Sequence, residues 1–104
     1  MLPESIVRSR QNPTYKQLRL LLRRDRRHQE RAFLVEGPRF IADALANRAI
    51  PTLLAYSESQ MSNADWLEIP GVPTRILDDE LFASISDTVA SQGMLAIFPI
   101  PTLE

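Results

Sequence analysis

The chain has 104 residues, of which 44% are hydrophobic and 24% charged, and this composition is typical of a single globular domain. It contains no cysteine, which excludes disulfides, thiolate zinc sites and cysteine nucleophiles. The N-terminus lacks the apolar stretch of a secretory signal, and no apolar run approaches the roughly 18 residues of a membrane helix. We therefore expect a cytoplasmic domain that makes no contact with membranes.

The net charge of −1 conceals a strong asymmetry along the chain. Residues 1–31 contain nine of the twelve basic residues and three acidic residues, so their net charge is +6. Residues 32–104 contain three basic and ten acidic residues, so their net charge is −7. Eleven of the basic residues are arginines, whose planar guanidinium groups can form bidentate bonds with phosphates. This separation of charge indicates a basic surface that binds a polyanion.

The first helix is expected to follow an extended arm over residues 1–12, with Asn12 as its cap and Pro13 at its first position. It should run to about residue 24, and residues 25–31 could either extend it or form a charged loop. An apolar stripe of helical period comprises Tyr15, Leu18, Leu21 and Leu22. A separate basic stripe on the same helix comprises Lys16, Arg19, Arg23 and Arg26.

Four short, continuously apolar segments are typical of buried strands, and they comprise residues 32–35, 52–57, 74–77 and 94–98. Helices are expected between them over 38–47 and, after a cap at Asp78, through Phe82 to Ile85. Between the second and third strands we expect at most a short helix around 64–67, followed by a turn over 70–73. Strands that alternate with helices predict an α/β sandwich, whose central and mainly parallel sheet has about four strands.

The two later helices have recognisable sides and starts. In the helix over 38–47, Arg39 and Asp43 are expected to pair on the outer side. Its buried face is predicted to comprise Phe40, Ile41, Ala44 and Leu45. The acidic run from Asp78 to Glu80 could mimic a divalent-cation cluster. The favoured interpretation is simpler, because Asp78 can cap the second helix and acids are stabilised in a first helical turn.

No motif of a catalytic site is recognisable. His28 is the only histidine, and without further ligands or a nucleophile nearby it is best explained as a solvated surface residue. Glu36 lies where the positive end of the following helix favours a carboxylate, which explains this residue without catalysis. The three glycines lie far apart and form no phosphate-binding loop. We therefore assign no catalytic residue and no metal site to this chain.

Three segments occur in a distinctive order: SRQNPTYKQLRLLLRRDRR over 9–27, FLVEGPRFIADAL over 33–45 and ISDTVASQGMLAIF over 85–98. Together they resemble the signature blocks of the SpoU/TrmH family of RNA ribose 2′-O-methyltransferases. The third block departs from the family at Ser91, where a proline usually precedes Gln-Gly. The positions that match the family signature most directly are Asn12, Glu36, Gly37, Gln92 and Gly93.

The resemblance implies that residues 13–98 are the N-terminal substrate-binding domain of such an enzyme. Its fold would be the three-layer α/β/α sandwich of the ribosomal proteins that bind RNA kink-turns. Residues 1–12 would be an arm, and residues 99–104 would begin a linker to a catalytic SPOUT domain whose motifs this chain lacks. The chain alone should then be inactive and bind no cofactor, whereas the full-length enzyme would use S-adenosylmethionine. Full-length relatives dimerise through that other domain, so we expect a monomer here.

The expected partner is structured RNA, either ribosomal or transfer RNA. Most aromatic residues fall on core positions, so phosphate and shape recognition is expected rather than stacking on bases. Two alternatives stay open: a stand-alone RNA-binding module of the ribosomal-protein type, and a protein-interaction domain whose arginine face binds an acidic partner. The residues that we expect to bind RNA are Lys16, Arg19, Arg23, Arg24, Arg26, Arg27 and Arg39.

Overall fold

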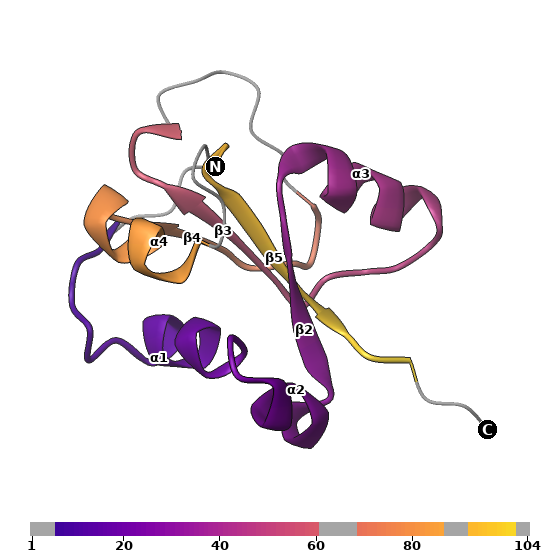
Figure 1. The fold of residues 1–104 in the computed structure, drawn as a ribbon. Helices are drawn as coiled ribbons and strands as arrows, with labels where there is room; N and C mark the ends of the chain where they lie inside the picture. The colour runs from indigo at the N-terminus through magenta and orange to yellow at the C-terminus, as the bar shows by residue number, and fades with distance from the viewer. Residues whose placement is uncertain (1–5, 61–68, 87–91, 102–104) are drawn as a thin grey trace.

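The computed structural model describes residues 6–60, 69–86 and 92–101. These ranges contain five strands and four helices (Figure 1), which follow one another as β1 (Ile6–Val7), α1 (Pro13–Leu20), α2 (Arg24–Glu30), β2 (Ala32–Glu36), α3 (Pro38–Ala46), β3 (Leu53–Ser57), β4 (Thr74–Leu77), α4 (Asp79–Ile85) and β5 (Met94–Pro99). None of the helices in these ranges is both long and apolar enough to cross a membrane. The short helix that was expected around 64–67 lies outside the described residues.

All five strands form one sheet in the order β1-β4-β3-β5-β2. β4 pairs in parallel with β1 and β3, whereas β5 runs antiparallel to its neighbours β3 and β2. Four strands therefore point in one direction, and the last strand opposes them. The predicted α/β class is confirmed. The reversed direction of β5 was not predicted, because a continuously apolar strand reveals its burial and not its direction.

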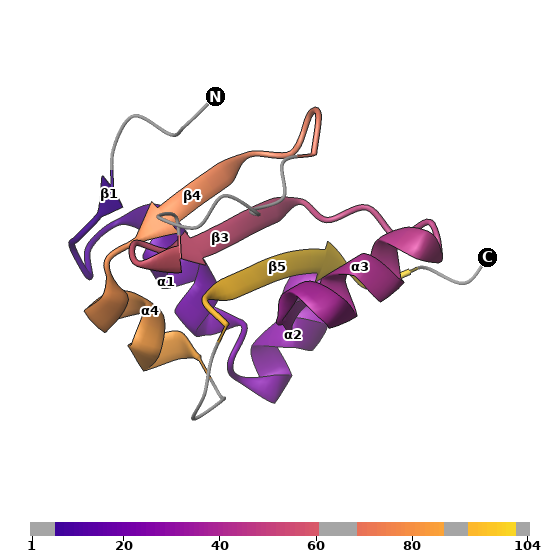
Figure 2. The ribbon, with the colours of Figure 1, turned by 90° about the horizontal axis from the view of Figure 1, so that it is seen from above.

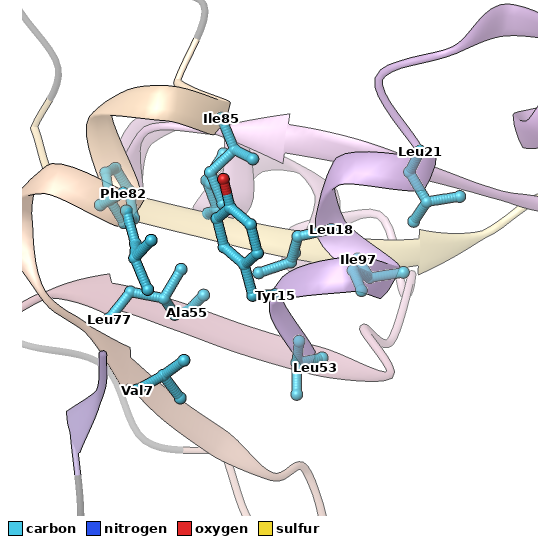
Figure 3. Packing of buried hydrophobic residues seen from close by; sticks show 12 residues of the cluster. Val7, Tyr15, Leu18, Leu21, Leu53, Ala55, Leu77, Phe82, Ile85 and Ile97 are labelled. Atoms are coloured by element: carbon cyan, nitrogen blue, oxygen red, sulfur yellow. The ribbon is translucent and has the colours of Figure 1, made fainter. Parts of the chain in front are cut away.

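One face of the sheet is covered by α1 and α4, as Figure 2 shows from above. Alternate residues of each strand point to this face, for example Leu53 and Ala55 of β3 and Leu95 and Ile97 of β5. Figure 3 shows the packed side chains of this core, which comprises Val7, Tyr15, Leu18, Leu21, Leu53, Ala55, Leu77, Leu81, Phe82, Ile85, Leu95 and Ile97. Burial of each large apolar side chain stabilises the fold by about 1.5–3 kcal/mol before entropy is counted.

The opposite face of the sheet is covered by α3, and the remaining strand residues point to it. Ile41 of α3 is completely buried there, and the Phe33 and Phe98 rings stack with their centroids 6.2 Å apart. The buried residues of this second core are Ile41, Leu54, Tyr56, Met94, Ala96 and Phe98. With helices on both faces, the predicted three-layer α/β/α sandwich is confirmed.

The predicted helix starts and the predicted turn are confirmed in atomic detail. Asn12 Oδ1 accepts a hydrogen bond from the Thr14 backbone N–H at 2.8 Å, and Pro13 begins α1. Asp78 Oδ1 accepts from the Leu81 N–H at 2.8 Å and caps α4. In the turn before β4, Gly71 adopts a φ of +81°, which suits a residue without a side chain.

The first helix is shorter than predicted. α1 ends at Leu20, the chain passes through a tight turn, and the separate helix α2 begins at Arg24. A continued helix would have placed Asp25 and Gln29 on the apolar side, so it would have had nothing to bury against the sheet. Arg23 and Arg26 therefore do not share a helix with Lys16. Leu22 is 40% exposed, and its predicted place in the buried stripe is wrong.

The sheet extends beyond both predicted edges of the domain. β1 lies inside the predicted arm and pairs with β4, so the arm contributes a strand to the sheet. At the other end, β5 includes Pro99, and the Ile100 N–H donates to the Arg31 carbonyl at 2.8 Å. The sheet therefore includes Pro99, the first residue of the segment that was predicted to begin a linker.

One assignment on α3 is wrong. Phe40 was predicted on the buried face, yet it is 67% exposed. The buried side of the helix centres on Ile41, Ala44 and Leu45, and Phe40 precedes Ile41 by one residue, or about 100° around the axis. The predicted pair of Arg39 and Asp43 is likewise not among the ion pairs formed by the described residues.

Candidate nucleic-acid interface

A shallow groove with strongly basic walls runs along the outer side of α1. We call it the basic groove, and its lining residues are Arg10, Tyr15, Lys16, Arg19, Leu20, Leu22 and Arg23. Four of these seven side chains are cationic and none is acidic. The groove brings together three of the predicted RNA-binding residues and adds Arg10, which was not predicted. Such a surface attracts an extended anion.

The hydroxyl group of Tyr15 lies at the centre of the polar contacts in the basic groove. Its oxygen accepts hydrogen bonds from Arg10 Nη1 at 2.8 Å and from Arg19 Nη1 at 3.4 Å. Arg10 also lies 5.8 Å from the centroid of the Tyr15 ring, within cation–π range. Desolvation raises the pKa of Tyr15, but the hydrogen bonds with Ser84 and Arg19 and the charges of Arg10 and Arg19 outweigh it and lower the pKa below its usual value.

α2 carries three more of the predicted residues: Arg24, Arg26 and Arg27. Arg24 is exposed at the first position of the helix, whereas Arg26 and Arg27 are half-buried. Arg26 Nη1 donates to the Gln29 side chain at 3.0 Å, and Arg27 Nη2 donates to the Leu22 carbonyl at 3.4 Å. The Nε atoms of both arginines are buried without a protein partner. A ligand cannot reach these buried nitrogens, so contacts with an external acceptor would use the remaining Nη hydrogens of each guanidinium group.

Charge neutralisation near these residues is slight. Arg23 Nη2 lies 3.1 Å from Asp25 Oδ2, but both side chains are more than 60% exposed, so the pair contributes at most about 1 kcal/mol. In the arm, Arg8 bonds to Glu58 at 3.0 Å, and this hydrogen bond and charge raise the pKa of Arg8. No carboxylate in the described part of the chain pairs with Arg10, so its charge remains available to a ligand.

A second groove lies at the edge of the sheet, between α2 and α3. We call it the edge groove, and its lining residues are Leu21, Leu22, Arg27, Leu34, Val35, Glu36, Phe40, Ile85 and Leu95. Most of its wall is apolar, and the exposed Phe40 and Leu22 side chains both contribute to it. Arg27 is its only basic residue, so this groove adjoins the basic surface without sharing its charge.

Arg39 does not join the other predicted residues. It is exposed on α3, which covers the opposite face of the sheet from α1. Neither the basic groove nor the edge groove includes it in its lining. The structure thus brings six of the seven predicted residues onto one segment and leaves Arg39 apart.

The signature residues have local structural roles. Glu36 accepts a hydrogen bond from the Ser86 hydroxyl and so connects the end of β2 with the residue after α4. Gly37 and Gly93 have φ values of +101° and +71°, which side-chain-bearing residues rarely adopt. Gln92 is exposed beside Gly93. Together with the cap at Asn12, these contacts position the chain at the ends of its elements.

The acidic run also has structural roles. Asp79 Oδ1 accepts hydrogen bonds from the backbone N–H and the hydroxyl of Ser59, at 3.0 and 2.9 Å, while Asp78 caps α4. In the described ranges, no three acidic, histidine or cysteine side chains form a group that could hold a metal ion. His28 is exposed and lines a small hollow with Arg24, Arg27 and Phe33.

The missed residues, Arg10 and Tyr15, were hard to find from sequence. Arg10 contributed to the charge count, but it belongs to no periodic stripe because it precedes the helix. Tyr15 matched the apolar stripe, and its ring is indeed 2% exposed within the core. Only the fold reveals that the polar tip of this buried side chain meets two arginines.

Fold and surface together define a three-layer α/β domain with a basic helical segment on one side. The chain belongs to the MRM3-like substrate-binding domain family, whose model matches residues 12–96. This confirms the resemblance to the N-terminal substrate-binding domains of SpoU/TrmH RNA ribose 2′-O-methyltransferases. No curated protein matches the sequence.

Solved structures of methyltransferases have the same fold. An RNA 2′-O ribose methyltransferase is 26% identical, with a TM-score of 0.74 over 96% of this chain. An rRNA methyltransferase from Sinorhizobium meliloti is 25% identical, with a TM-score of 0.69 over 91% of this chain. A putative RNA methyltransferase of the TrmH family from Porphyromonas gingivalis is 24% identical, with a TM-score of 0.65 over 97% of this chain. The chain spans 40% of the first structure and 36% of the other two.

Proposed function

We propose that this chain is the RNA-recognition domain of an S-adenosylmethionine-dependent RNA ribose 2′-O-methyltransferase, that ribosomal RNA is its substrate, and that a separate domain of the same protein transfers the methyl group. The isolated chain would be an inactive monomer, and the full protein a cytoplasmic homodimer. The similar structures support this proposal, since they include an RNA 2′-O ribose methyltransferase and an AdoMet-bound rRNA methyltransferase.

The observation that carries the proposal is the concentration of basic side chains on one segment. Residues 16–27 supply six cationic side chains from α1, α2 and the turn between them, and Asp25 is the only acidic residue in that segment. Arginine side chains at this density can follow a phosphate backbone and release its counterions. The contacts are expected to fix the register of the RNA, because phosphate contacts position a nucleic acid without reading its sequence.

The basic groove is a poor fit for the cofactor. S-adenosylmethionine carries a positively charged sulfonium group, and the basic groove presents four cations and no carboxylate to it. We therefore expect calorimetric titration of the isolated chain with S-adenosylmethionine to give no saturable binding at micromolar concentration. Saturable binding in that range would contradict the assignment of the cofactor to another domain.

The direct test is RNA binding across a salt series. We expect the chain to bind structured ribosomal RNA fragments, with log K falling linearly against log salt by about 0.7–0.9 for each neutralised phosphate. Changing Arg23, Arg24 and Arg27 together to Gln should weaken binding at least about a hundredfold, if each contact contributes about 1 kcal/mol or more.

The matched control changes Arg48 and Arg75 to Gln, which removes two exposed charges outside the basic segment. Its affinity for RNA should stay within about twofold of the original chain, since distant surface charges are screened by salt. Affinity that does not fall with salt would contradict the proposal. Binding to an acidic protein but not to RNA would instead support a protein-interaction domain.

A further inference from the structure

We propose that Arg10 and Arg19 bind one and the same backbone phosphate of the RNA, and that the buried Tyr15 is the positioning residue that holds both guanidinium groups for it. The inference rests on the proposed function and makes it more specific. It adds Arg10 of the arm to the interface and gives a role to the hydroxyl group of Tyr15, whose ring lies in the core.

The first step is the direction of the hydrogen bonds around Tyr15. Ser84 Oγ donates to the Leu81 carbonyl at 2.7 Å, so its single hydrogen is already used. The bond of 2.7 Å between Ser84 Oγ and the Tyr15 hydroxyl therefore has Tyr15 as its donor. The phenol oxygen then has two lone pairs left, and these accept from Arg10 and Arg19. Every hydrogen-bonding position of the hydroxyl group is thus assigned.

The second step is the rigidity of the phenol. The Tyr15 side chain is only 2% exposed, and its ring is packed among the core residues shown in Figure 3, with its hydroxyl directed towards α4. Packing of the ring in the core therefore fixes the position of the hydroxyl oxygen. Two long, exposed arginines that bond to it lose part of their freedom before any ligand arrives, which lowers the entropic cost of binding.

The third step is the charge of the arrangement. Two guanidinium groups within hydrogen-bonding range of one oxygen atom repel each other, and no carboxylate among the described residues that line the groove offsets this repulsion. An anion placed between them would remove the repulsion and gain charge-assisted hydrogen bonds from both. A phosphodiester has one negative charge and two unbridged oxygens, so it can accept from each arginine.

The number of phosphates is tested by the salt dependence of RNA binding. Arg10→Gln alone and Arg19→Gln alone should each weaken binding about tenfold but change the salt slope little, because the remaining arginine still neutralises the phosphate. The double variant should lower the slope by about 0.7–0.9, the contribution of one phosphate. Single variants that each lower the slope by about 0.7–0.9, with a double variant that lowers it by twice that amount, would show two separate phosphates and overturn the proposal.

The positioning role is tested by Tyr15→Phe, which keeps the ring in the core and leaves every charge in place. We expect about threefold to tenfold weaker RNA binding. In the Tyr15→Phe background, Arg10→Gln should cost less affinity than in the original chain, as the two residues act through one contact. The control is Ser84→Ala, which removes the other partner of the phenol and no arginine contact, and it should leave affinity within about twofold.

The outcomes also distinguish this inference from the proposed function. Independent, additive effects of Tyr15→Phe and Arg10→Gln would overturn the positioning role, and so would equal losses from Tyr15→Phe and Ser84→Ala. Thermal unfolding of each variant shows whether it is folded at the assay temperature. If the α2 arginine variants lose RNA binding while Arg10→Gln does not, the shared-phosphate site fails but the proposed function stands. If the original chain binds no RNA, both fail.

Discussion

Glu36 precedes Ser86 by fifty residues, yet its carboxylate accepts a hydrogen bond from the Ser86 hydroxyl. These two residues belong to the second and third sequence blocks that resemble the methyltransferase family. The bond therefore links the second block to the third in the folded chain. A carboxylate at this position could have been interpreted as a catalytic acid, and its geometry assigns it instead to the joint between β2, α3 and α4.

Gly93 is the residue for which the structure makes the sharpest prediction about stability. A methyl group at this position would collide with Ser57 Oγ and with Gln60 Cβ, and the φ of +71° would also be strained. We expect Gly93→Ala to lower the free energy of unfolding by more than about 2 kcal/mol in urea denaturation.

The matched control for Gly93 is Gly37→Ala. Gly37 also has a positive φ, +101°, but nothing lies within 4 Å of an added methyl group. Its cost should come from the backbone alone, which lies at a ψ of 141° close to the region that only glycine adopts, and amount to about 1–3 kcal/mol. Equal losses at the two positions would mean that the collision with Ser57 and Gln60 does not determine the requirement for glycine.

At the scale of elements, the sequence predicted every strand after the arm to within one residue at either end. This succeeded because both faces of the sheet are covered, so most strands are apolar runs that polar turns delimit. The end of α1 could not be predicted in the same way. Its boundary depends on where the sheet stops offering apolar surface, which is a property of the packed molecule and not of local propensity.

Arg48, which follows α3, allows a prediction about a helix end. It has a φ of +67° and is exposed, and left-handed backbone costs a residue with a side chain about 1 kcal/mol relative to glycine. We expect Arg48→Gly to raise the free energy of unfolding by about 0.5–1 kcal/mol in urea denaturation. Arg48→Ala removes the same charge but keeps the strained backbone, so it should give no such gain.

At the scale of the whole molecule, the uneven distribution of charge along the chain was enough to predict a basic surface. The charge distribution along the chain could not predict which basic residues lie together on the folded surface. Arg39 was grouped with the others because it matches a family block, yet the topology places it on the far side of the sheet from α1. Arg10 was omitted, although the pairing of β1 with β4 brings the arm beside α1.

The sheet order also predicts which backbone hydrogen bonds of the sheet open most readily. β3 and β5 are central strands whose residues are buried almost throughout, whereas β1 is a short edge strand of two residues. We expect backbone amides of Leu54, Tyr56 and Ile97 to exchange with deuterium most slowly in NMR measurements, and the amide of Val7 much faster. Slower exchange at Val7 than in β3 would contradict this order.

The position of β2 at the sheet edge has a consequence for synthesis of the chain. β2 is paired only with β5 among the described strands, so Glu36 meets its partner Leu95 only after most of the domain has been made. A nascent chain that ends before residue 94 already carries all nine basic residues of its first third, but it lacks the strand that holds β2 and the adjoining α2 in place. The basic surface therefore acquires its final shape only when the last strand emerges from the ribosome.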